Sequence, residues 1–233
     1  ELVFTAFSGS HQDAISKGMT HREETGEYKW TVPYLPIDPV DVGRTYDSDV
    51  IRINSQSGKG GVAYVLKHNF GLVLPDKMRE EVGYLMKGVS DHEHAELSPQ
   101  EMLDVFKEKY CNPKKIFEIV EAHFEQKDGI VAKVTIRQDG VKEVVEAKGN
   151  GRINAVNNAV KKYFDISYTL DEYEEHSLSK KSDAQAIAYV GITQDEKKLY
   201  WGAGIHEDII TASIDALEHA VNVMLDQKKD RIR

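Results

Sequence analysis

The chain has 233 residues, which is enough for one large domain or two small ones. Hydrophobic residues make up 40% and charged residues 30%, an ordinary composition for a globular protein. The net charge of −9 and the lack of a long basic cluster argue against a nucleic-acid partner. No run approaches the ~20 apolar residues of a membrane span, so no membrane partner is expected. The single cysteine, Cys111, allows no internal disulfide, and we expect a cytoplasmic protein.

The first residues form an apolar, strand-like run without an initiator Met or a signal peptide, which indicates a piece of a longer protein. His11 follows between small residues, close to a predicted helix start. A histidine in this setting suits proton transfer near neutral pH, although a lone histidine is more often a structural hydrogen-bonding group.

Residues 30–39 hold three of the six prolines together with several large apolar side chains. Proline favours extended backbone, and the apolar residues predict an ordered connector that is pressed against another surface. Arg44 and Tyr46 follow near a turn, where they could orient an anionic substrate or simply lie on the surface.

Helices are predicted in the rest of the first half, at residues 62–67, 77–87 and after the capping box of residues 98–101. The loop before residue 62 has Gly60 where a phosphate-binding loop needs Ser or Thr, so nucleotide hydrolysis is rejected. His92, Glu93, His94 and Glu96 suggest a metal site by composition, but a solvated loop is the preferred interpretation.

The second half changes to strands at residues 116–126, 130–137 and 141–148, separated by Asp-Gly turns and followed by a helix. A similar order recurs, with strands at 166–174, 184–192 and 199–201 and a helix that carries Ala212 and Ala216 where the first carries Ala155 and Ala159. The fold class is therefore predicted as α+β, with helical segments followed by two duplicated β-β-β-α units over residues 116–227.

Each predicted β-β-β-α repeat has a Gly-x-Gly where its last strand is expected to meet the helix, at residues 149–151 and 202–204. Two glycines at such a junction let a ligand approach the backbone, and a helix start favours a carboxylate. The alternative is that the glycines only make tight turns. Small residues at 182–186 would suit a close interface or a narrow apolar pocket.

These segments together resemble 2-isopropylmalate synthase, in the branch of that family with the longer linker region. Residues 4–15 resemble the segment at the end of the family's barrel, and residues 30–38, 41–54 and 57–64 resemble its linker subdomains. Residues 149–151, 173–176 and 183–186 resemble its regulatory domain.

The resemblance implies three parts: residues 1–48 as the end of the barrel and linker subdomain I, 49–114 as helical linker subdomain II, and 115–233 as the C-terminal allosteric dimerisation domain. It also implies that the whole enzyme is an acyltransferase of leucine biosynthesis, which joins acetyl-CoA to 2-oxoisovalerate with a divalent metal held in the barrel. The family's metal motif is missing from this sequence. The chain alone is therefore expected to be inactive and to hold no cofactor or metal.

The resemblance assigns roles to individual residues. His11 and Tyr46 match residues that assist at the active site when the barrel is present. A homodimer is implied, with leucine as the feedback effector. The residues carried over to the effector site are Gly149, Asn150, Gly151, Tyr173, Ala184 and Ala186. Asn154 and Ser177 stand where relatives can carry Ala, which leaves the shape of the pocket and the identity of the effector open.

Two other hypotheses remain. The first is the regulatory domain of a citramalate or homocitrate synthase, against which the long match in the first half argues. The second is a free-standing amino-acid-binding dimerisation module, against which the strand-like start without Met argues. A barrel with a His-x-His motif upstream of residue 1 would decide between an enzyme fragment and a free-standing module.

Overall fold

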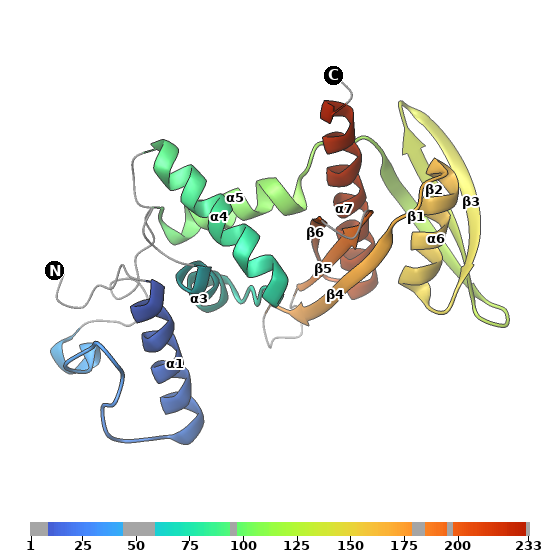
Figure 1. Cartoon of the computed structure of the whole chain (residues 1–233). Helices are drawn as coiled ribbons and strands as arrows, with labels where there is room; N and C mark the ends of the chain where they lie inside the picture. Colours follow the sequence, from blue (N-terminus) through green and yellow to red (C-terminus); the bar gives the residue numbers. More distant parts are fainter. Residues whose placement is uncertain (1–8, 44–58, 94–96, 179–184, 195–197, 232–233) are drawn as a thin grey trace. The chain divides into compact units, whose positions relative to one another are not determined.

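A computed structural model describes residues 9–43, 59–93, 97–178, 185–194 and 198–231 (Figure 1). Tyr46, Ala184 and most of the small-residue segment 182–186 lie outside these ranges. The chain divides into two compact units, residues 1–106 and 107–233. No described helix is both long enough and apolar enough to cross a membrane.

Helices make up the regular structure described in the first unit. They are α1 (Gly9–Thr25), the short 3-10 helix η2 (Pro39–Val42), α3 (Lys59–Phe70), α4 (Asp76–Glu93) and α5 (Pro99–Phe106). The apolar stripe predicted in α4 is buried at Met78, Val82 and Met86. The capping box before α5 is confirmed, because Ser98 N donates to Glu101 Oε2 at 2.7 Å and Glu101 N donates to Ser98 Oγ at 3.3 Å.

The proline-rich connector of the first unit is ordered and folds back on α1. Gly18 of α1 lets it approach closely, since a Cβ there would lie 2.7 Å from the Pro33 ring and 3.3 Å from Val32 Cα. Val32 and Leu35 are buried, and Trp30 Nε1 donates to Leu35 O at 2.8 Å. The surface against which this connector is pressed is thus, in part, a helix of its own unit.

The second unit begins with the π-helical turn η3 (Lys107–Cys111) and then holds two β-β-β-α motifs (Figure 1). The first motif is β1 (Glu118–Gln126), β2 (Ile130–Gln138), β3 (Val141–Gly149) and α6 (Arg152–Phe164). The second is β4 (Thr169–Ser177), β5 (Ala186–Thr193), β6 (Leu199–His206) and α7 (Ile209–Arg231). Each motif has a three-stranded antiparallel sheet with its strands in chain order, so the predicted α+β class and the two motifs are confirmed.

The first sheet owes its two hairpins to Asp-Gly pairs. Asp128 and Gly129 have φ of 43° and 111°, and Asp139 and Gly140 have φ of 49° and 83°. In the second hairpin Asp139 and Gly140 are the two loop residues, and positive φ at both matches the right-handed twist of the flanking strands, whereas the first hairpin has a three-residue loop at 127–129. These turns fix the register, so that Gln126 pairs with Ile130 and Gln138 with Val141.

The two motifs share one hydrophobic core. α6 packs on β2 and β3, and α7 packs on β5 and β6. The inward faces of the central strands meet in this core at Ala132, Val134 and Ile136 of β2 and at Ala188, Val190 and Ile192 of β5. The duplication extends to packing, because Ala155 and Ala159 take the same places, counted from the start of α6, as Ala212 and Ala216 take in α7.

Candidate functional site

The start of α6 is the first part of the candidate effector site. Gly151 is the N-cap residue, with φ −150° and ψ 175°, and no side chain caps this end of the helix. A Cβ added at Gly151 would meet no described atom within 4 Å. The first N–H groups of a helix have no partner within the helix and carry partial positive charge, so this end can accept an anionic group.

Gly149 has a different role from Gly151. It is the last residue of β3, and a Cβ there would overlap the backbone of Ala155 in α6. Asn150 lies between the two glycines, and its N–H donates to Asn154 Oδ1 at 3.1 Å. Gly149 therefore allows close packing of strand on helix, while Gly151 leaves open space at the helix start.

The second Gly-x-Gly does not form an equivalent junction, and that prediction is wrong. β6 continues to His206, so Gly202 and Gly204 lie inside the strand. A Cβ at either position would overlap backbone atoms of α7. The physical reason is the close approach of α7 to β6, which leaves no room for a side chain.

The start of α7 is also closed by a side chain, unlike that of α6. Asp208 Oδ1 accepts hydrogen bonds from Thr211 N at 2.7 Å and from Thr211 Oγ1 at 3.0 Å. These bonds hold the pKa of the Asp208 carboxyl below its usual value. Of the two helix starts, only that of α6 lacks a side-chain cap and stays open for an anion.

Tyr173 and Ala186 belong to the second motif, whereas residues 149–151 belong to the first. Tyr173 is 39% exposed on β4, and its hydroxyl lies 2.9 Å from Ser213 Oγ of α7 and contacts Glu175. Burial, together with the Glu175 carboxylate, raises the pKa of Tyr173 to about 12. Ala186 is half-buried at the start of β5, where it pairs with Ser177 and His206. The predicted effector residues thus come from both motifs, and their joint role stays a prediction.

Glu175 and Ser213 were not among the effector residues predicted from the sequence, although both contact Tyr173. Ser213 is fully buried and its Oγ donates to Ile209 O at 2.7 Å. A buried serine among the apolar residues of α7 was the available signal.

The first unit contains the other predicted site residues. His11 is exposed on α1 and stacks on Tyr34 with ring centroids 4.0 Å apart, while Tyr46, the other residue predicted to assist the reaction, lies outside the described residues. His92 lies in the last turn of α4 rather than in a loop, and His94 and Glu96 are not described. No group of three potential metal ligands occurs within the described part of the chain.

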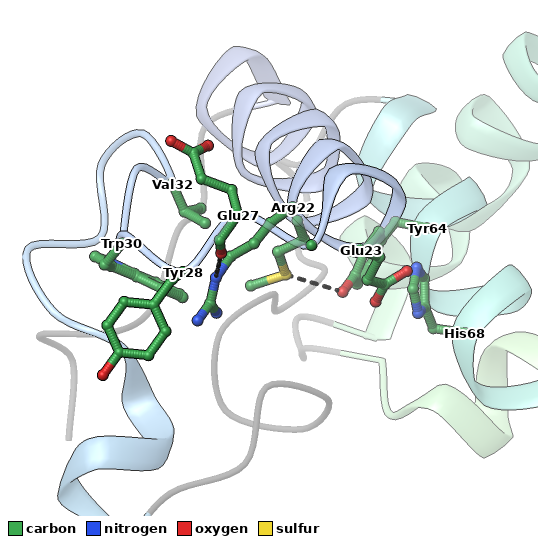
Figure 2. A pocket seen from close by; sticks show the side chains of 10 residues that line it. Arg22, Glu23, Glu27, Tyr28, Trp30, Val32, Tyr64 and His68 are labelled. Atoms are coloured by element: carbon green, nitrogen blue, oxygen red, sulfur yellow. Dashed lines mark hydrogen bonds between the residues drawn. The ribbon is translucent and has the colours of Figure 1, made fainter.

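A cavity of about 570 Å³ opens beside α1 and α3 in the first unit (Figure 2). The Arg22 guanidinium lies 4.9 Å over the Trp30 ring and 3.0 Å from Asp38 Oδ2. Tyr64 donates to Met19 Sδ at 3.3 Å. Sequence reasoning did not find this cavity. Arg22 Nε also donates to Glu27 O at 3.3 Å, and the Tyr64 and His68 rings stack with centroids 4.0 Å apart.

Comparison with known proteins agrees with this geometry. Residues 1–67 match the family described as alpha-isopropylmalate synthase, post-catalytic domain-like, and residues 96–225 match the LeuA allosteric (dimerisation) domain. The chain is 48% identical over 225 residues to a 2-isopropylmalate synthase of Desulfitobacterium hafniense, covering 97% of this chain and 40% of that protein. It is 46% identical to the enzyme of Helicobacter hepaticus and 42% to that of Clostridium acetobutylicum, each over 95% of this chain and 41% of the relative.

The chain spans about two fifths of the length of these relatives. More than half of it matches the allosteric domain, and that match covers the first β-β-β-α motif with the open start of α6, and the second motif as far as residue 225 of α7. The chain belongs to the 2-isopropylmalate synthase family.

Proposed function

We propose that this chain is the regulatory part of a 2-isopropylmalate synthase and that its second unit binds leucine as a feedback inhibitor. The whole enzyme would be an acyltransferase of the cytoplasm, condensing acetyl-CoA with 2-oxoisovalerate in leucine biosynthesis. The observation that carries the proposal is the uncapped start of α6 after Gly149, in a domain of the allosteric family. A leucine carboxylate would accept hydrogen bonds from the first backbone N–H groups of the helix there.

The remaining parts of the proposal concern the whole enzyme. The chain would form a homodimer through its second unit, and His11 and Tyr46 would assist the reaction of the full-length protein. The barrel and its divalent metal would lie in the part of the relatives that this chain does not span. Alone, the chain would be inactive, and CoA release from acetyl-CoA and 2-oxoisovalerate above background would contradict this.

Relatives named 2-isopropylmalate synthase favour leucine over the effectors of a citramalate or homocitrate synthase. Calorimetric titration of the chain with leucine, isoleucine and valine tests this choice. An aliphatic pocket discriminates weakly, since one methylene is worth ~1–3 kcal/mol. We therefore expect leucine to bind tightest and the other two to bind more weakly rather than not at all.

A size series at Gly151 tests the position of the site. Its φ of −150° suits any residue, and the space around it is open, so Gly151→Ala and Gly151→Val should both fold. Leucine affinity should fall from Gly to Ala to Val if the ligand occupies that space. Ala186→Leu should also fill the pocket, and in the full-length enzyme Gly151→Val and Ala186→Leu should abolish inhibition while leaving uninhibited turnover largely intact.

The control for this series is Asn158→Ala, which removes the exposed 2.9 Å hydrogen bond from Asn158 Nδ2 of α6 to Lys148 O of β3. It should bind leucine as the parent does. Unchanged leucine affinity in Gly151→Val and Ala186→Leu would place the site elsewhere and leave the glycines as packing residues only.

A further inference from the structure

Tyr34 of the proline-rich connector has a backbone conformation that is unfavourable for a large side chain. Its φ is 64°, in the left-handed region that glycine and asparagine adopt most readily. It follows Pro33 in a turn, and turns with positive φ at the second central residue usually have Gly or Asn there. Other residues keep such a conformation only where the surrounding structure holds it, and these positions cluster at functional sites.

Burial does not explain why a tyrosine occupies this position. Tyr34 is 61% exposed, whereas Val32 and Leu35, on either side of the turn, are buried. A glycine would make the same turn without backbone strain and without loss of these buried contacts. The aromatic ring therefore points to a use other than packing of the core.

The Tyr34 ring lies against His11. The two rings stack with centroids 4.0 Å apart and with 27° between their planes. His11 is exposed near the start of α1, and an exposed side chain exchanges between rotamers within nanoseconds. A stack on a ring that is itself held in place favours one of these rotamers.

The turn is held by the same helix that carries His11. Pro33 packs so closely on Gly18 of α1 that a Cβ there would lie 2.7 Å from the proline ring. A hydrogen bond of 2.8 Å from Trp30 Nε1 to Leu35 O joins the segments before and after the turn. Helix α1 therefore supports both the histidine and the turn that carries its stacking partner.

We propose that Tyr34 is a positioning residue, which holds the His11 imidazole in the orientation that proton transfer requires. This inference rests on the proposed function, in which His11 assists the reaction of the full-length enzyme. Proton transfer needs the imidazole nitrogen within about 2.6–3.2 Å of its partner atom, and a misplacement of about 1 Å can lower the rate about 100-fold. Tyr34 contributes the face of its ring, so its hydroxyl is not required.

Proton NMR of the histidine rings tests the orientation in this chain. The signals that disappear in His11→Gln belong to His11. They should lie upfield, because the imidazole is stacked on the face of the Tyr34 ring. Tyr34→Leu should return them towards the positions of an unstructured histidine, and Tyr34→Phe should keep them upfield. Signals that do not move in Tyr34→Leu would overturn the proposal.

Turnover of the full-length enzyme tests the consequence for the reaction. Tyr34→Leu keeps an apolar side chain at the same φ but lacks an aromatic face. It should lower kcat by about 10- to 100-fold and leave KM for 2-oxoisovalerate nearly unchanged. Tyr34→Phe should retain most of the parental kcat. The matched control is Tyr28→Leu, since Tyr28 precedes the connector, is 97% exposed and should be replaceable without loss of kcat.

A double-mutant cycle separates positioning from a merely structural role. If Tyr34 acts through His11, Tyr34→Leu should cause no further loss of kcat when it is added to His11→Ala. Additive losses, or parental kcat in Tyr34→Leu, would overturn this inference and leave the role of His11 standing. Parental kcat in His11→Ala would overturn both.

Tyr34→Gly is the second variant, because it removes the ring and the backbone strain together. This chain should then unfold at a urea midpoint no lower than that of the parent, while kcat of the full-length enzyme falls as in Tyr34→Leu. A lower midpoint with parental kcat would show that the tyrosine serves stability and would overturn the proposal.

Discussion

Replacing Asn222 with alanine is expected to lower the free energy of unfolding of the second unit by about 3 kcal/mol. Asn222 of α7 is fully buried and holds the backbone that leads into β1. Its Oδ1 accepts from Ile116 N at 2.7 Å and from Phe117 N at 3.1 Å, and its Nδ2 donates to Phe117 O at 3.0 Å. One side chain therefore satisfies three backbone groups.

The magnitude follows from how many of these groups water can reach in the variant. Phe117 is 2% exposed, so its N–H and C=O would both stay buried without a partner. Each such group costs ~1–3 kcal/mol. Ile116 is half-buried and can regain water, which leaves a total near 3 kcal/mol. That is a large part of the ~5–15 kcal/mol that stabilises a typical domain.

Urea denaturation followed by far-ultraviolet circular dichroism measures this loss. Asn158→Ala is the matched control, since its exposed hydrogen bond should contribute less than about 1 kcal/mol. Equal urea midpoints for the Asn222 and Asn158 variants would refute the reasoning. Burial would then not determine how much an asparagine hydrogen bond contributes to the free energy of unfolding.

Three further variants or measurements test the packing and the buried ionisable groups. Gly204→Ala should lower the free energy of unfolding by about 3 kcal/mol or more, because its Cβ would overlap the α7 backbone. Gly88 lies in open space on α4, so Gly88→Ala should raise the free energy of unfolding by about 1 kcal/mol in the same urea assay. Burial raises the pKa of Glu218, so stability should fall as pH rises above the carboxyl's unfolded pKa. The amide of Glu218→Gln can still accept the hydrogen bond from Ile119 N. The free energy of unfolding of this variant should therefore rise relative to that of the parent between pH 4 and pH 7. Burial raises the pKa of Cys111 to about 12, so alkylation at pH 8 should be slow in the native chain and fast in guanidinium; equal rates would show the thiol to be accessible.

The parts of the fold that local chemistry determines were predicted from the sequence. Asp139 and Gly140 need positive φ for a tight hairpin, and this pair tolerates it whatever the rest of the chain does. The capping box at Ser98 and Glu101 likewise depends on residues within one helical turn. Both motifs of the second unit follow from such signals combined with apolar periodicity.

The extent of β6 could not be predicted in the same way. Gly202 and Gly204 suggested a turn, yet neither has positive φ, and both lie within a strand under α7. A glycine is used either for a special backbone angle or for close approach of another segment. Only the position of the α7 backbone distinguishes these uses, and that position is a long-range feature of packing.

The candidate site shows the same division between local and long-range information. Resemblance pointed to Tyr173, but its contacts with Glu175 and Ser213 depend on the pairing of β4 and on the packing of α7 across the second sheet. The duplication supplies the comparison that a single sequence lacks, because Val156 shows what fills the position of Ser213 when only packing is required. Burying a hydroxyl costs free energy unless it is paired, and Ser213 Oγ is paired because it donates to Ile209 O at 2.7 Å. Polar side chains at Tyr173, Glu175 and Ser213 therefore occupy one face of the second motif, and only the pairing of β4 and the packing of α7 bring them together.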